Sequence, residues 1–86
     1  MADRLVLRSR KGYAGDVLAL CNPGESWSPR FKNDAIRDIE DNTHSYFIRR
    51  NGVRISIVVC FSKGSKYLIT DNKISSNNYL GDLENC

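Results

Sequence analysis

The dipeptide Asn51-Gly52, set between two apolar runs, is the feature that most constrains how this chain can fold. Asn-Gly supplies the positive φ that both central residues of a type I′ turn require, and this two-residue turn fixes the register of its hairpin. The sequence therefore predicts that Arg49 lies directly opposite Arg54. The register also fixes which side chains share a face, because successive strand residues point to opposite sides.

The two faces of this predicted hairpin differ in chemistry. One is a continuous apolar stripe that we expect to face the core: Tyr46, Ile48, Val53, Ile55, Ile57, Val59 and Phe61. The other mixes charged and apolar side chains: Phe47, Arg49, Arg54, Ser56, Val58 and Cys60. A further strand after a turn at Lys63-Gly64 makes residues 45–70 a predicted β-meander, whose apolar middle strand is central.

Two further elements are predicted before the meander. Residues 4–21 hold two short apolar runs joined by a basic, glycine-containing segment, which indicates a hairpin with a basic loop. Residues 28–42 carry the apolar spacing of one helix face. Ser28 before Pro29 is typical of an N-cap followed by proline at the first helical position, and Asn33 is the alternative cap of a shorter helix.

The length of 86 residues fits a single domain, 1–86. The predicted order is strand, strand, helix and three strands, followed by an irregular packed tail over residues 71–86. We expect an α+β fold in which a small antiparallel sheet of about five strands packs against one helix. The apolar part of the second sheet face needs cover from the tail or from a second copy of the chain, so a homodimer is the alternative.

The cysteines and the hydropathy pattern bear on the setting of the protein. Cys21, Cys60 and Cys86 are odd in number and lack C-x-x-C spacing, which favours reduced thiols over a disulfide framework and argues against structural zinc. No apolar run approaches a signal-peptide core or a membrane span. We therefore expect a cytoplasmic protein without a membrane partner.

Acid-base and metal chemistry find little support in the sequence. His44 is the only histidine, so a site built from two histidines is excluded. The helix carboxylates Asp34, Asp38 and Glu40 lie among their own counter-ions, and an apolar pocket that would raise a carboxyl pKa is not indicated. We predict no catalytic residue, no metal ligand and no cofactor, and expect a non-catalytic binding protein rather than an enzyme.

The arginine pair is the main candidate for binding. Like charges directly opposite on neighbouring strands are destabilising, so Arg49 and Arg54 predict either a nearby carboxylate, such as Asp82 or Glu84, or a bound anion. Arginine beside an aromatic ring suits a nucleotide base and its phosphates. The predicted anion or nucleotide site comprises Arg49, Arg54, Phe47, Tyr67, Lys66, Thr70, Asn77, Asn78 and Trp27.

A second basic cluster gives the alternative hypothesis. Arg8, Arg10 and Lys11, with Tyr13, lie at the predicted loop tip of the first hairpin, and Arg30 adds a further charge. Such a cluster is suited to clamping a nucleic-acid backbone. The net charge of +3 permits a polyanionic partner without requiring one.

Several motifs, taken in order, resemble a known family. They are Trp27, Ala35-Ile36-x-x-Ile39, His44-Ser45-Tyr46-Phe47, Lys66-Tyr67-Leu68-x-Thr70 and Asn77-Asn78-Tyr79-Leu80-x-x-Leu83 before a cysteine. Their order and spacing resemble the small bacterial and phage-borne proteins classed as domain of unknown function 3892. The resemblance implies a compact α+β unit and a shared site framed by Lys-Tyr-Leu-x-Thr and the asparagine pair. It implies no activity.

The sequence departs from that family at Asp41-Asn42, where many relatives have glycine, and it lacks a proline before Cys86. Small phage proteins of this size often act by binding. By that analogy we expect the chain to sequester an anionic, nucleotide-derived ligand or to block a bacterial defence protein.

Overall fold

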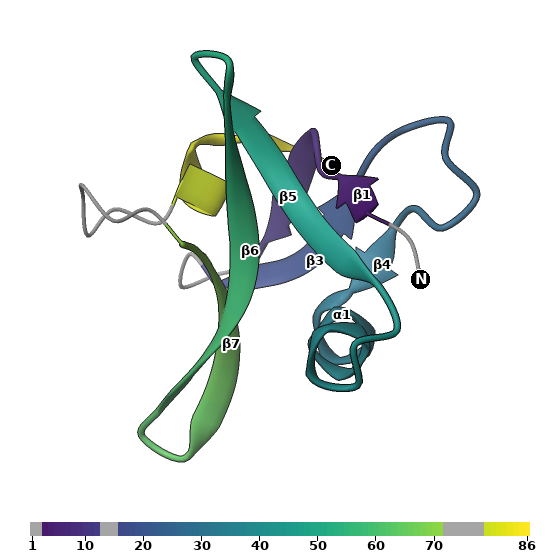
Figure 1. Cartoon of the computed structure of the whole chain (residues 1–86). Coiled ribbons are helices and arrows are strands. Elements are labelled where there is room, and N and C mark those ends of the chain that lie inside the picture. Colours follow the sequence, from purple (N-terminus) through teal and green to yellow (C-terminus); the bar gives the residue numbers. More distant parts are fainter. Residues whose placement is uncertain (1–2, 13–15, 72–78) are drawn as a thin grey trace.

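The fold is α+β, as predicted, and its computed structural model describes residues 3–12, 16–71 and 79–86 (Figure 1). The strands are β1 (Asp3–Leu5), β2 (Arg8–Lys11), β3 (Val17–Cys21), β4 (Arg30–Phe31), β5 (Ser45–Arg50), β6 (Val53–Ser62), β7 (Ser65–Thr70) and β8 (Glu84–Asn85). The helices are α1 (Lys32–Glu40) and the 3-10 helix η1 (Tyr79–Asp82).

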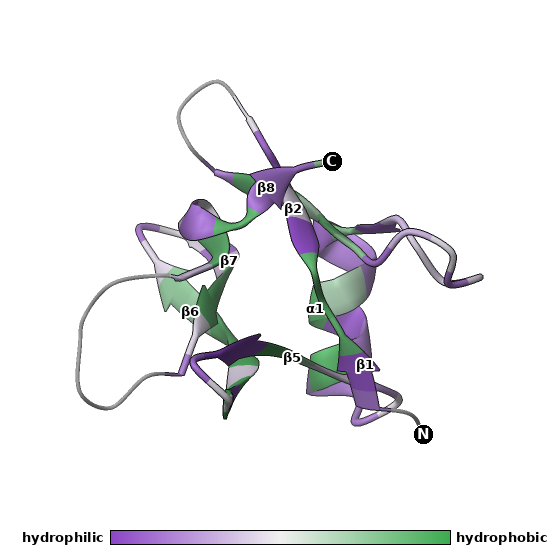
Figure 2. Cartoon of the chain, turned by 90° about the horizontal axis from the view of Figure 1, so that it is seen from above, coloured by the Kyte–Doolittle hydropathy of each residue, from purple (hydrophilic) through white to green (hydrophobic). Residues whose placement is uncertain are grey.

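The described strands form two four-stranded sheets, in the orders β1-β5-β6-β7 and β4-β3-β2-β8, where we predicted one sheet of about five strands. The chain passes from one sheet to the other between β1 and β2. There the Val6 amide donates to the Phe47 carbonyl in one sheet, and the Leu7 amide donates to the Cys21 carbonyl in the other. Figure 2 shows the sheets and α1 arranged around a common interior.

The predicted meander is confirmed in order and in register. Arg49 pairs with Arg54 across the turn, and Asn51 and Gly52 both have positive φ, 53° and 77°. A second turn with positive φ at Lys63 and Gly64 returns the chain into β7. β6 lies between β5 and β7 and is therefore central in that part of the sheet.

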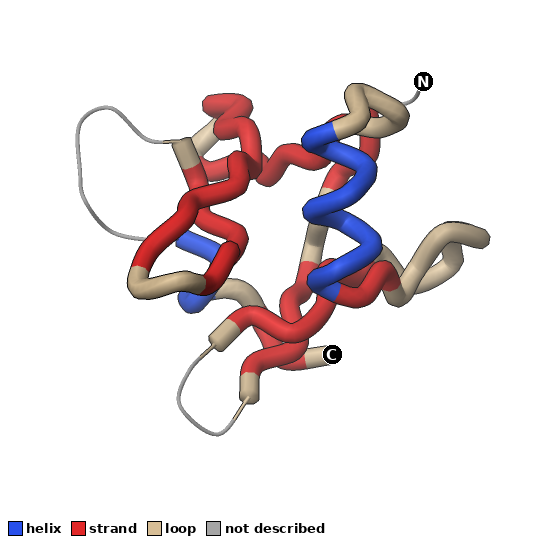
Figure 3. The backbone as a smooth tube through the Cα atoms, turned by 90° about the horizontal axis from the view of Figure 1, so that it is seen from below, coloured by secondary structure: helices blue, strands red, loops and turns tan. Residues whose placement is uncertain are grey.

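The core fills the space between the two sheets and α1, which runs along one side of the strands (Figure 3). It contains Val6, Val17, Leu20, Ala35, Ile36, Tyr46, Ile48, Ile57, Leu68 and Leu80. Of the predicted apolar stripe, Ile55 and Val59 are partly buried and pack against this core, whereas the two residues next to the hairpin turns are exposed. Val53 is 59% exposed and Phe61 is 68% exposed.

The helix begins later than predicted, at Lys32. Phe31 is the N-cap residue and makes no side-chain capping bond, so the predicted caps Ser28 and Asn33 are both wrong. The Ser28-Pro29 peptide bond is cis, and the Ser28 hydroxyl accepts a hydrogen bond from the Asn22 amide. The chain then pairs with β3 as β4 before it turns into the helix, which explains the shorter span.

The basic residues of the first hairpin lie in β2 and not at a loop tip. Arg8, Arg10 and Lys11 pair with β3 in antiparallel register, because the hairpin strand is formed by these polar residues themselves and begins only after the apolar run 5–7. Tyr13, predicted beside them, lies outside the described residues.

The tail is packed, as its apolar residues suggested, and part of it is regular. Leu80 in η1 is fully buried, and β8 pairs in parallel with β2. The tail residues Asn77 and Asn78 lie outside the described residues.

A disulfide joins Cys21 to Cys86, so the prediction of reduced thiols is wrong for these two residues. Spacing could not reveal the pair, because 65 residues separate the cysteines and only the β3-β2-β8 arrangement brings them together. Cys60 is the free cysteine.

Candidate anion-binding site

One member of the predicted arginine pair, Arg54, has a carboxylate partner that the sequence did not single out. Arg54 Nη2 lies 3.1 Å from Asp3 Oδ2. β1 runs parallel to β5 and places Asp3 beside Ser45, whose hydroxyl also donates to the Asp3 carboxylate. Hydrogen bonds from Ser45 and Arg54 lower the pKa of Asp3 below its usual value. The carboxylate therefore favours its charged form next to Arg54.

The carboxylates proposed for this role have other partners. Asp82 lies 3.5 Å from Arg50, and Glu84 lies 3.6 Å from Arg8. Asp82 lies in η1 and Glu84 in β8, so the tail places them beside other arginines.

Phe47 lies beneath the two arginines. The guanidinium carbon of Arg54 is 4.1 Å from the ring centroid, and that of Arg49 is 5.9 Å away. Phe47 is buried, so its ring is used as a platform for arginine. The ring is thus not open to a nucleotide base, contrary to the role we predicted for it.

Tyr67 shares a face with the arginine pair but lies far from it. It pairs with Cys60, whose sulfur lies within hydrogen-bond distance of the Tyr67 hydroxyl oxygen at 3.2 Å, and the hydrogen bond with Cys60 raises the pKa of Tyr67. Cys60 lies six positions after Arg54 in β6, roughly 20 Å along an extended strand. A single small ligand therefore cannot contact both groups.

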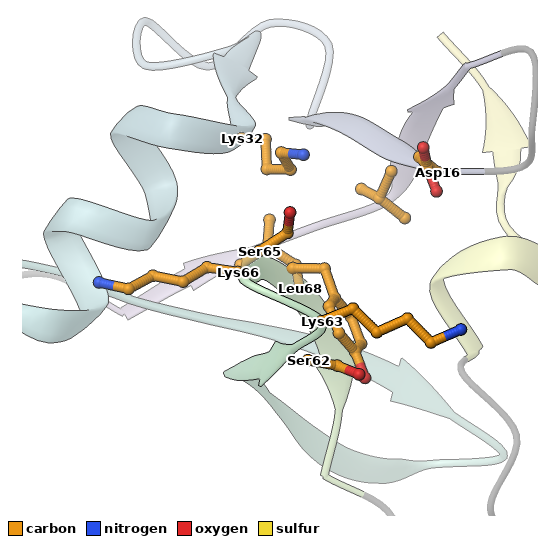
Figure 4. Close-up of a pocket in the computed structure, with 9 residues that line it drawn as sticks. Asp16, Lys32, Ser62, Lys63, Ser65, Lys66 and Leu68 are labelled. Carbon is orange, nitrogen blue, oxygen red and sulfur yellow. The ribbon is translucent and has the colours of Figure 1, made fainter.

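A pocket of about 390 Å³ lies between the tip of the β6–β7 hairpin, the start of α1 and the start of β3 (Figure 4). It unites two predicted site residues, Lys66 and Tyr67, with residues that the sequence did not indicate. The lining consists of Asp16, Val17, Lys32, Ser62, Lys63, Ser65, Lys66, Tyr67 and Leu68.

The three lysines of the pocket differ in their surroundings, and Lys66 is the one with a carboxylate partner among the described residues. Lys66 Nζ lies 2.7 Å from Glu40 Oε2, and Figure 4 shows this side chain extended toward α1. Lys63 extends in the other direction, and Lys32 lies above the hairpin. Three lysines against Asp16 give the lining an excess of two positive charges, of which Glu40 neutralises one.

Trp27 and Arg30 lie in a different, largely buried cluster around Asp38. Arg30 donates two hydrogen bonds of 2.9 Å to the Asp38 carboxylate, and the Tyr46 hydroxyl donates a third of 2.6 Å. Arg4 donates to the Tyr46 oxygen over 2.8 Å, and its guanidinium carbon is 5.5 Å from the Trp27 ring centroid. These contacts join β1, β4, α1 and β5.

The protonation of this cluster is set by its contacts. Burial alone raises the pKa of Asp38, but hydrogen bonds from Arg30 and Tyr46 outweigh it, so the pKa lies below the usual 3.8. The hydrogen bond to Asp38 raises the pKa of Arg30. Burial, and then the hydrogen bond to Asp38, raise the pKa of Tyr46. The cluster is therefore a fixed ion pair, which argues against Arg30 as a free contact for nucleic acid.

His44 completes the Asp38 cluster. Its Nε2 lies 3.2 Å from Nη2 of Arg4, and because arginine only donates, Nε2 is the acceptor. The proton of the neutral ring is thus on Nδ1, which is buried without a hydrogen-bond partner among the described residues. This arrangement links His44 of the strand entry to Arg4 of β1.

The remaining predicted residue, Thr70, is buried, and its hydroxyl accepts a hydrogen bond from the Tyr79 amide. It therefore anchors η1 and does not line the pocket. Sequence reasoning missed Lys32 and Lys63 as site residues. The Lys63-Gly64 turn was recognisable, but its position against α1 is a property of the tertiary structure.

Comparisons with known proteins assign no relative. No protein-family model matches the chain, and neither a curated protein nor a solved structure matches it. Within residues 3–12, 16–71 and 79–86, no helix is long and apolar enough to cross a membrane. In the same residues, no group of three or more His, Cys, Asp or Glu side chains is arranged to hold a metal ion.

Proposed function

We propose that the protein is a non-catalytic binding protein that captures a small anionic ligand of the nucleotide class in the pocket at the β6–β7 hairpin. The observation that carries this proposal is a pocket of about 390 Å³ whose lining joins three lysines and three hydroxyl groups with a single carboxylate. Ammonium and hydroxyl groups are suited to phosphate oxygens.

The size and the walls of the pocket favour a small ligand. Small-molecule sites span roughly 300–1,000 Å³, so this one is at the lower end and suits a mononucleotide better than a polymer. Val17, Leu68 and the ring of Tyr67 supply apolar wall for a base or sugar. Lys32 and Lys63 are the cations we assign to the phosphate, since Lys66 is paired with Glu40.

We also propose that the outer face of the β5-β6-β7 sheet serves as a contact between two copies of the chain. Val58, Cys60 and Ile69 are only partly buried there, and Tyr67 is exposed. Apolar side chains that share one sheet face form the kind of surface that a partner covers.

The biological role that we infer is sequestration of a nucleotide signal, or inhibition of a bacterial defence protein, in the cytoplasm. This role is supported only by the analogy with small phage proteins that act by binding and by the pocket. The cytoplasm is reducing, so in this setting the Cys21–Cys86 disulfide would be open to reduction.

The test is a thermal-shift screen against inorganic phosphate, mononucleotides, cyclic nucleotides and ADP-ribose derivatives. A ligand at one hundred times its Kd stabilises the folded state by about 2.7 kcal/mol. In a domain of this size that corresponds to a rise in Tm of roughly 10–20 °C. We expect Lys32→Ala and Lys63→Ala to abolish the shift.

Arg49→Ala is the matched control, because it removes a cation at a distance from the pocket and should leave the shift unchanged. A shift lost in Arg49→Ala and kept in Lys63→Ala would place the ligand at the arginine pair and contradict the proposal. The absence of a shift with every phosphate compound would contradict it as well.

A further inference from the structure

The edge of β2 is occupied by the chain's own last residues, Leu83–Cys86, which we call the tail segment. Within it β8 pairs in parallel with β2, with Glu84 beside Arg8 and Asn85 beside Ser9. This pairing covers the side of β2 that faces away from β3.

The tail segment engages all three cations of β2. Glu84 Oε2 lies 3.6 Å from Arg8 Nε. Lys11 donates from Nζ to the Leu83 carbonyl over 2.6 Å, and its amide donates to Asn85 Oδ1 over 3.0 Å. Arg10 Nε donates to the Cys86 carbonyl over 3.1 Å. The edge therefore recognises an extended backbone that carries an acidic side chain.

The tail segment is fixed on both sides by attachments that are stronger than its pairing with β2. On one side η1 is anchored by fully buried Leu80, whose carbonyl accepts a 2.6 Å hydrogen bond from the Ser9 hydroxyl. On the other side the disulfide ties Cys86 to Cys21 of β3. Between them lies a strand of two exposed residues, and such a short strand pairs weakly unless it is tethered.

We propose that the edge of β2 is a binding site for an extended acidic segment of a partner protein, and that reduction of Cys21–Cys86 makes it available. The partner strand would add to the sheet by main-chain hydrogen bonds, with a carboxylate on Arg8 and carbonyl oxygens on Lys11 and Arg10. While the disulfide is intact, the tail segment competes at high effective concentration and keeps the partner out. This inference is independent of the proposed ligand pocket.

The reducing step needs a dithiol. Cys86 is partly exposed and Cys21 is buried, so a thiolate of the dithiol attacks the Cys86 sulfur and releases Cys21 as a thiolate, which takes up a proton. The second thiol of the reductant then displaces Cys86 and forms the reductant's own disulfide. Two electrons and two protons pass to the protein, and its two cysteines end as thiols.

The test uses a fluorescent synthetic peptide with the sequence of residues 79–86, in which serine replaces the last cysteine. Its binding to the full chain is measured by fluorescence anisotropy with the disulfide intact, after reduction by dithiothreitol, and in Cys86→Ser. We expect binding at least about tenfold tighter to the reduced protein and to Cys86→Ser than to the oxidised protein. A peptide carrying lysine in place of the glutamate should bind more weakly.

Amide hydrogen exchange gives a readout that does not depend on the peptide. The Lys11 amide should lose protection on reduction, while amides of β6 keep theirs, which also shows that the reduced chain is folded. Equal peptide binding to oxidised and reduced protein, or no binding to either, would overturn the proposal, and so would unchanged protection of Lys11. Lys63→Ala should bind the peptide normally, which separates this test from that of the pocket.

Discussion

Two clusters of this molecule combine arginine, a carboxylate and an aromatic ring, and they differ in burial. In one, the side chain of Asp38 is 7% exposed and that of Arg30 is 34% exposed. In the other, the side chain of Asp3 is 55% exposed and that of Arg54 is 51% exposed. The distances are similar, 2.9 Å and 3.1 Å.

Burial decides what each cluster contributes. Exposed ion pairs contribute little, because water and salt screen them, whereas removing one partner of a buried pair leaves an uncompensated charge. The Asp38 cluster therefore fixes four elements of the fold, and the Arg54 cluster is nearly neutral in stability. Arginines that look alike in the sequence thus have different roles. Neither cluster is the ligand site that we propose, which is the pocket at the β6–β7 hairpin.

Asp38→Asn should have the largest effect on stability, because it removes the carboxylate of the buried cluster. It leaves Arg30 and Arg4 without a carboxylate, and we expect a loss of about 3 kcal/mol in the free energy of unfolding. Asp3→Asn is the matched control and should change it by less than about 0.5 kcal/mol. Urea denaturation measures both variants. Equal losses would show that burial does not separate the two clusters.

The pH dependence of stability sharpens the same contrast. The pKa of Asp38 is lower in the folded chain than its usual 3.8, so its contribution is fully present above that value. The contribution is lost as the pH falls below 3.8 and through the lower, folded pKa. Urea denaturation across this acidic range should show a slope that Asp38→Asn reduces. A slope unchanged in that variant would contradict the assignment.

Tyr46→Phe should have a smaller effect than removal of the carboxylate. It deletes a hydroxyl that donates to Asp38 and accepts from Arg4. Leaving buried Asp38 and partly buried Arg4 short of one hydrogen bond each costs about 1–2 kcal/mol. Thermal unfolding monitored by circular dichroism measures the loss. A loss below a few tenths of a kcal/mol would mean that water replaces the hydroxyl.

Arg54→Ala should have the smallest effect. It removes an exposed ion pair with Asp3 and uncovers the Phe47 ring, and we expect a change within about 0.5 kcal/mol. Its effect is best read beside Arg49→Ala, which removes a neighbouring cation of the same face. A loss above about 2 kcal/mol in the free energy of unfolding would contradict this expectation, because it would equal the effect expected of a buried ion pair.

Local chemistry predicted the hairpin register well and the helix start poorly. Asn51-Gly52 acts through its own backbone, so Arg49 opposite Arg54 could be read from the sequence. Ser28 has the chemistry of an N-cap. The residues that follow it pair with β3 as β4, however, so the helix begins only at Lys32. Pairing with a distant strand here outweighs local preference.

The tertiary contacts were beyond the reach of the sequence pattern. The hydrogen bond from Arg4 to Tyr46 joins residues 42 positions apart in the sequence, and the Cys21–Cys86 disulfide joins residues 65 positions apart. The pocket is of the same kind, since Lys32 and Lys63 line one pocket only because the hairpin tip packs near α1. Lys66 and Tyr67 were predicted as site residues, but with the arginine pair as neighbours, which strand geometry places roughly 20 Å away.

The most direct test of the proposed ligand pocket is an NMR titration of the ¹⁵N-labelled protein with the nucleotide that gives the largest thermal shift. We expect saturable chemical-shift changes at Lys32, Lys63 and Ser65, with little change at Arg49 and Arg54. Shifts centred on Arg49 and Arg54, with the hairpin tip unchanged, would contradict the assignment of the ligand to this pocket.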